Sequence, residues 1–194
     1  MQDWIYDDGG HSFPVETPSA IPANHPLRKL FATMVERAFL LKLGVFDSAV
    51  TTYVADVLTD FSHMKSVYKV RNLSGIALEE IADMLVEADV RLSATSFNRE
   101  REVHKHIGDF ALFWTGVFPD ALPRLQASRR KDFLVDYVEQ GKSSYAIAAS
   151  FDHGVYEEQA PVLKRLSDEF ELCMLGLNYV RSEIDQLPNK AQAA

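Results

Sequence analysis

The stretch EVHKHIGDFALFWTGVFP, residues 102–119, contains the hydrophobic pattern that decides the fold. At about 100° per residue its main apolar positions form one narrow stripe, which is typical of a helix facing a core; these are Val103, Ile107, Phe110, Trp114 and Val117. From position 110 to 118 the segment is apolar nearly all round. We therefore expect it to be the central helix of the domain. The alternative is that its outer face meets a second chain.

Apolar residues recur at helical spacing from residue 26 onward, and no alternating strand pattern of useful length is present. Pro26 suits a first helical position and Gly44 a stop, so a first helix should end near Leu43. Asp47 or Ser48 can cap the second helix, and Asn98 the fourth. Further helices are expected at about 78–88, 98–118, 130–150 and 158–184. The sequence predicts an all-α, single-domain bundle of about six helices.

Residues 1–26 differ in composition from the rest of the chain. They hold four of the eight prolines and no basic residue, which predicts an extended, Pro-rich N-terminal arm without regular elements. The helical bundle should then cover residues 27–187, and residues 188–194 should form a frayed tail. Trp4, Ile5 and Tyr6 in the arm are costly to leave in water. We expect them to dock on their own domain, or else to bind a protein partner or a second copy.

The composition excludes several classes of protein. With 20 Lys and Arg against 28 Asp and Glu, the net charge of −8 argues against nucleic acid as a partner. The longest apolar run is far shorter than the roughly 18 residues that a membrane span requires. The single cysteine and the absence of a basic, apolar leader at the start predict a cytoplasmic protein.

Several residues within predicted helices have a structural interpretation. Glycine in a helix costs about 1 kcal/mol relative to alanine, so Gly108, Gly141 and Gly176 indicate close approach of another helix. Tyr145 falls on an apolar stripe and should pack in the core with its hydroxyl satisfied. Cys173 should be an inert, buried thiol.

Three side chains in the opening stretch have the spacing of a possible binding site. Glu102 and His106 are four residues apart, and Asp109 follows three later, so all three can converge above one helix face. Helical ligands at this spacing can chelate one ion, and Asp60 and His63 in the second helix are candidate facing ligands. His104 falls on the opposite flank, so the two histidines cannot share a metal.

The same three residues also suit the polar edge of a core-facing helix, and this is the interpretation that we favour. Because no catalytic motif is present, the sequence predicts a non-catalytic interaction or regulatory protein without a cofactor, self-associating or binding a protein partner. The alternative is a helical bundle that binds a small ligand or a divalent metal such as iron, zinc or manganese around Glu102, His106 and Asp109. With a bound metal it could be a metalloenzyme.

Overall fold

The computed structural model describes the backbone of residues 4–6, 12–14, 21–22, 24–89, 91–92, 94, 96–128 and 131–192, and the side chains of those from 21 to 187. The helices in these ranges are α1 (Pro26–Arg37), α2 (Ser48–Phe61), α3 (Met64–Val67), α4 (Ile81–Ala88), α5 (Phe97–Val117), α6 (Leu122–Ser128), α7 (Tyr137–Ala149), α8 (Ala160–Asp168) and α9 (Phe170–Gln192). A π-helix, η1 (Ala38–Leu43), and two 3-10 helices, η2 (Asp132–Leu134) and η3 (Gly154–Tyr156), connect them. The predicted all-α class is confirmed for the bundle.

The predicted number of about six helices is wrong, because the described ranges contain nine α-helices. The expected helix at 158–184 is two helices, α8 and α9, which meet at Glu169. The expected helix at 130–150 begins only at Tyr137. The short helices α3 and α6 were not predicted, since four and seven residues are too few to show a clear helical period.

The N-terminal arm contains a short β-hairpin, contrary to the expectation of no regular element. Strands β1 (Trp4–Tyr6) and β2 (Ser12–Pro14) pair antiparallel, with Ile5 opposite Phe13. Aromatic and β-branched residues favour strands, so the sequences of the two strands suit this pairing. The side chains of Trp4, Ile5 and Tyr6 lie outside the described residues, so their docking stays a prediction.

Side-chain caps fix where several helices begin. Asp47 accepts hydrogen bonds from the backbone N–H groups of Ala49 and Val50, both at 3.0 Å, as one of the two predicted caps of α2. Helix α5 is capped by Ser96 and not by the predicted Asn98. Asp136 caps α7, which explains why that helix starts later than its apolar pattern suggests.

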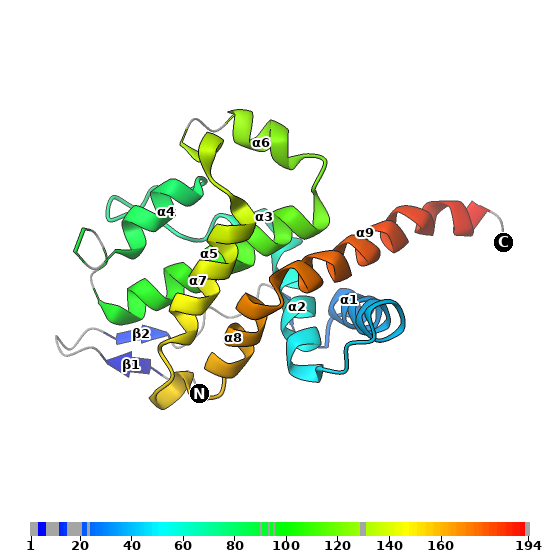
Figure 1. Ribbon diagram of the computed structural model, residues 1–194, viewed down its shortest axis with the longest axis horizontal. Helices are drawn as coiled ribbons and strands as arrows, with labels where there is room; N and C mark the ends of the chain where they lie inside the picture. Colours follow the sequence, from blue (N-terminus) through cyan, green and yellow to red (C-terminus); the bar gives the residue numbers. More distant parts are fainter. Residues whose placement is uncertain are drawn as a thin grey trace.

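Helix α5 is the central helix, as predicted. It packs against α7, α9, α4 and α2, and Figure 1 shows it crossing behind α7 between α4 and α9. Every residue from Phe110 to Phe113 is buried. An element surrounded by other helices must be apolar on all sides, which accounts for the pattern in the sequence.

Glycines bring helices close together around α5, which confirms the predicted role of Gly108, Gly141 and Gly176. A Cβ atom at Gly108 would lie 2.5 Å from the ring of Tyr145, and one at Gly141 would lie 2.6 Å from the ring of Phe170. Gly176 meets the ring of Phe39 in the same way. These glycines therefore leave room for aromatic rings rather than for a ligand.

None of the helices in the described ranges combines the length and the apolar character required to cross a bilayer.

Candidate functional site

A concave pocket of about 680 Å³ lies between α2, the segment around α3, α5 and the start of α8. This volume is within the usual range for small-molecule sites, roughly 300–1,000 Å³. Ten charged side chains line it: Arg28, Lys65, Lys69, Arg101 and Lys105, and Asp56, Asp60, Glu102, Asp109 and Glu158. A hollow with so many ionisable groups is the strongest candidate for a functional site among the described residues.

Helix α5 supplies one wall of the pocket through residues at helical spacing. Arg101, Lys105 and Asp109 follow one another at intervals of four, so their side chains lie along one face of the helix. Helix α2 supplies the facing wall with Tyr53 and Asp56. The pocket therefore lies beside the central helix α5, at the point where the polar first half of this helix borders the core.

The floor of the pocket is a hydrogen-bonded carboxylate, Asp109, which is 3% exposed. Its Oδ1 accepts hydrogen bonds from the hydroxyls of Tyr53 at 2.7 Å and Tyr145 at 2.9 Å. Its Oδ2 lies 3.4 Å from Nζ of Lys105. The buried hydroxyl of Tyr145 is thus satisfied, as predicted from its place on the apolar stripe of α7.

The Lys105–Asp109 pair is ionised at neutral pH. Burial by itself would raise the pKa of Asp109, but the positive charges of Lys105 and Lys69 hold this pKa below its ordinary value. Burial likewise lowers the pKa of Lys105, but Asp109, Tyr53 and Glu102 together outweigh this effect and raise the pKa. The pKa values of Tyr53 and Tyr145 are well above 10.0 because of burial and the nearby carboxylate, so both tyrosines stay protonated donors.

Arg101 forms the second buried charge of the pocket, with 1% of its surface exposed. One terminal nitrogen pairs with Glu102, and the other donates to the side-chain oxygen of Gln159 at 2.7 Å. The guanidinium stacks 3.8 Å from the ring centre of Tyr156. Among the described residues its Nε–H has no hydrogen-bond partner, although it is buried.

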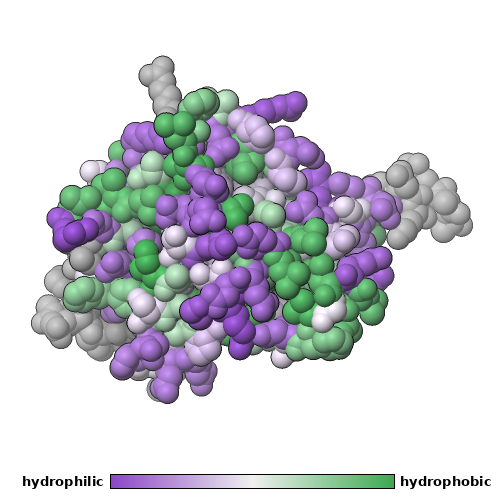
Figure 2. Space-filling view, in the orientation of Figure 1, coloured by the Kyte–Doolittle hydropathy of each residue, from purple (hydrophilic) through white to green (hydrophobic). Residues whose placement is uncertain are grey.

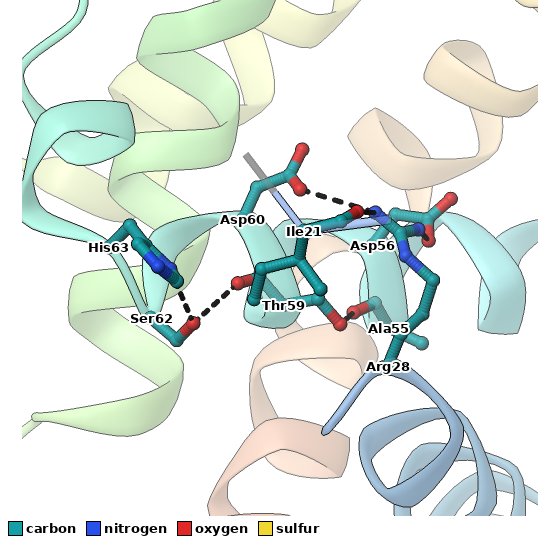
Figure 3. A network of polar contacts seen from close by, with 8 residues as sticks. All are labelled: Ile21, Arg28, Ala55, Asp56, Thr59, Asp60, Ser62 and His63. Atoms are coloured by element: carbon teal, nitrogen blue, oxygen red, sulfur yellow. Dashed lines mark hydrogen bonds and ion pairs between the residues drawn. The ribbon is translucent and has the colours of Figure 1, made fainter. Parts of the chain in front are cut away.

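The predicted facing ligands do not act together. Asp60 lines the pocket, and both Asp60 and Asp56 pair with Arg28 of α1 (Figure 3). His63 lies beyond the end of α2, exposed to solvent, with its ring beside the hydroxyl of Ser62. The end of the helix at Phe61 separates His63 from the acidic face of α2.

His106 faces the core rather than the pocket. It is fully buried. Its ring lies beside those of Phe61 and Phe110, with ring centres 5.5 and 6.2 Å away. Its Nε2 must carry the proton, because its partner at 3.1 Å is the carbonyl oxygen of Val67, which can only accept. Burial and the positive charge of Lys69 lower the pKa of His106 to about 3, so the ring is neutral.

The predicted trio of metal ligands is therefore divided between two environments. Glu102 and Asp109 line the pocket, whereas His106 binds a backbone carbonyl inside the core. Glu102 pairs with Arg101 and not with His106. Within the ranges that the structure describes, no three His, Cys, Asp or Glu side chains are close enough to hold one metal ion.

The other histidine of the opening stretch, His104, is buried against α7, with Nδ1 3.4 Å from the hydroxyl of Ser144. Burial lowers its pKa. His104 and His106 thus lie on different sides of α5, as the helical wheel predicts. Cys173 is buried, as expected, and burial raises the pKa of its thiol to about 12, which makes it unreactive.

Sequence reasoning missed the cations and the tyrosine of the pocket. Arg101 and Lys105 could have been found from their spacing of four with Asp109. Tyr53 and Lys69 carry no comparable signal, because they come from other segments and meet α5 only through the packing of the bundle.

Comparisons of the chain with protein-family models, with curated proteins and with solved structures give no match. Function must therefore be inferred from the chemistry of the site.

Proposed function

We propose that this protein binds a small polar molecule in the pocket between α2 and α5. The observation that carries this proposal is the ionised Lys105–Asp109 pair on the pocket floor, held by two tyrosine hydroxyls. Taking charges out of water costs several kcal/mol per ion, and apolar residues of similar size usually stabilise a fold as well or better. A charged pair at the base of a hollow of about 680 Å³ is better explained by recognition than by stability.

The rest of the pocket supports the same function. Eight of its ten charged groups lie on helices, so the positions of most of them are set before a ligand arrives, whereas Lys69 and Glu158 lie in connecting segments. The sequence offered a ligand-binding bundle as an alternative, and this proposal retains its small-ligand form. Glu102 lies in the wall of the pocket and Asp109 in its floor. His106 is a neutral core residue behind them.

A pocket-filling substitution tests the proposal. Thr52 is an exposed helical residue in the pocket lining, and Thr52→Trp should occupy part of the hollow. Thr33→Trp is a matched control, since Thr33 is also an exposed helical threonine but does not line the pocket.

Ligand-observed NMR with a library of small polar compounds should detect binding to the unchanged protein and to Thr33→Trp. Thr52→Trp should weaken that binding at least tenfold. Equal binding to both variants would place the ligands elsewhere, and a library without any binder would contradict the proposal.

A second proposal is self-association through an apolar corner, which we define as Leu40, Leu41 and Phe46. Leu41 and Phe46 are 69% and 85% exposed; Leu41 lies near the end of η1, and Phe46 lies in the connection from η1 to α2. Figure 2 shows apolar surface over the end of the molecule where α1 and η1 lie. Exposed clusters of large apolar side chains often mark interfaces between proteins.

Light scattering at increasing protein concentration tests this second proposal. The mass should rise with concentration in the unchanged protein, and Phe46→Ser should abolish the rise. Leu73→Ser, at a loop residue that is 73% exposed, is the control and should behave like the unchanged protein. A monomer at all concentrations would refute self-association.

A further inference from the structure

The short helix α3 forms one wall of the pocket and is fixed to the bundle at few points. Lys65 and Ser66 of α3 and Lys69 just after it line the hollow. Of the four residues of α3, all of which the structure describes, only Val67 is buried. A helix of four residues is not stable by itself in water. Helix α3 therefore depends on its contacts with the rest of the bundle to stay folded.

The central helix supplies the polar contact that holds α3. The Nε2–H group of His106 donates to the backbone carbonyl of Val67 at 3.1 Å, and the side chain of Val67 packs in the core. Tyr68, the next residue, lies near Phe110 of α5, with 6.2 Å between the ring centres. The His106–Val67 hydrogen bond thus joins the end of α3 to the middle of α5.

The surroundings of His106 do not accommodate a second ring proton. Its Nδ1 atom is buried and has no hydrogen-bond partner in the described part of the chain. A proton on Nδ1 would add a buried donor without an acceptor and, at the same time, a buried positive charge. Protonation of His106 therefore requires access to water.

The charged groups around His106 also disfavour a protonated ring. Lys69, which follows α3, and Lys105 of α5 are positive, and Asp109 of α5 is the negative group that opposes them. The neighbour from α2 is the uncharged ring of Phe61. Burial first, and Lys69 next, lower the pKa of His106 to about 3. Movement of α3 away from α5 would give the ring access to water and take Lys69 away from it.

We propose that the His106–Val67 hydrogen bond is an acid-sensitive contact, and that protonation of His106 stabilises an open form in which residues 62–70 have moved away from α5. The open form binds a proton that the closed form excludes, so acid raises its population. It stays a minor species, and the native state as a whole still excludes the proton. Opening removes the wall of the pocket that α3 provides. The contact belongs to the fold and acts whether or not the pocket binds a ligand.

Amide hydrogen exchange measured by NMR tests the proposal. A histidine in water titrates near pH 6.5, so a change from pH 7.5 to 5.5 should raise the open population about tenfold. The reporters are the N–H groups of Val67, Tyr68 and Leu78, which donate to backbone carbonyls in and beside this segment. Their protection, corrected for the intrinsic exchange rate, should fall by that factor. They should also exchange faster than the amides of α7, because α3 opens without the rest of the bundle.

Two variants identify the group that takes up the proton. His106→Gln keeps an N–H donor for Val67 but cannot titrate, so the protection of the three amides should no longer depend on pH. His63→Gln is the matched control, since His63 begins the same segment but is exposed in the closed form. It should retain the tenfold change.

The ring signals of the unchanged protein give a measurement that needs no variant. Between pH 7.5 and 5.5 the NMR signals of the exposed His63 ring should shift, whereas those of His106 should stay constant, because the closed form excludes the proton. A His106 ring that titrates near pH 6.5 would contradict this.

Other results would also overturn the proposal. If the α3 amides exchanged as slowly as those of α7, this segment would not open separately from the bundle. If their protection did not change with pH, or still changed in His106→Gln, His106 would not control the opening. Each measurement is made without a ligand, so its outcome is independent of the proposed ligand-binding function.

Discussion

At the scale of single residues, Asp109 is the group on which the pocket depends. It is the acceptor for two tyrosine hydroxyls and the counter-ion of Lys105. Asp109→Asn keeps the shape but removes the charge, which leaves the largely buried ammonium of Lys105 without compensation. We expect a loss of about 3 kcal/mol in the free energy of unfolding, the lower end of what breaking a buried ion pair costs. Urea denaturation at pH 7 measures it.

Asp56→Asn is the matched control, because this carboxylate pairs with Arg28 but is 46% exposed. Solvent screens such pairs, so its loss should cost less than about 1 kcal/mol. A cost for Asp109→Asn no greater than that of Asp56→Asn would mean that Lys105 is not held by this carboxylate.

The candidate site shows what residue patterns alone can predict. Glu102 and Asp109 were placed on one helix face, and both line the pocket. His106 lies close to them on the helical wheel but is turned into the core, a difference of a few tens of degrees that a wheel does not resolve. The partner of His106 is a backbone carbonyl, which no side-chain pattern reveals.

At the scale of elements, the contact between α5, α7 and α9 depends on small residues. At Gly141 an added methyl group would lie 2.6 Å from the ring of Phe170 and 2.9 Å from Cβ of Ala111. Gly141→Ala gains about 1 kcal/mol in helix propensity. Overpacking against a rigid ring typically costs about 1–3 kcal/mol, so we expect a net loss of stability in thermal denaturation.

Ser143→Ala is the control for this substitution, since Ser143 is exposed on the same helix. It should change stability only slightly, in the favourable direction, because alanine has the higher helix propensity. If Gly141→Ala stabilised the protein, Phe170 would have to move aside readily, and close packing would not explain the glycine.

Periodicity predicted which segments are helical but not where every helix ends. Leu163, Leu166, Phe170, Cys173 and Leu177 continue one helical stripe across the break between α8 and α9. The residue at the break is Glu169, and neither a glycine nor a proline is present there to signal the end of α8. The break arises because α8 packs on α7 and α2 whereas α9 packs on α5 and η1. Such long-range packing is not encoded in a local pattern.

At the scale of the whole molecule, buried ionisable groups make stability depend on pH. His106 is neutral in the native state, with a pKa of about 3, whereas a histidine in the unfolded chain titrates near 6.5. Below pH 6.5 the unfolded state therefore binds a proton that the native state excludes, and stability falls. Asp109 acts at lower pH: its native pKa is depressed, so its contribution is present above 3.8 and is lost as the pH falls through the lower native value.

These two groups predict a specific acid-unfolding curve. Between pH 6.5 and about 4, His106 should remove up to about 1.4 kcal/mol of unfolding free energy per pH unit. His106→Gln keeps an N–H donor for Val67 but cannot titrate, so its curve should be flatter over this range. His153→Gln, at a histidine whose side chain is 95% exposed, should keep the slope of the unchanged protein. Denaturant titrations at several pH values supply the comparison, and equal slopes for His106→Gln and the unchanged protein would show that His106 takes up a proton in the native state. The proton would then have to be accommodated beside Lys69, with α3, which carries Val67, moving away from α5.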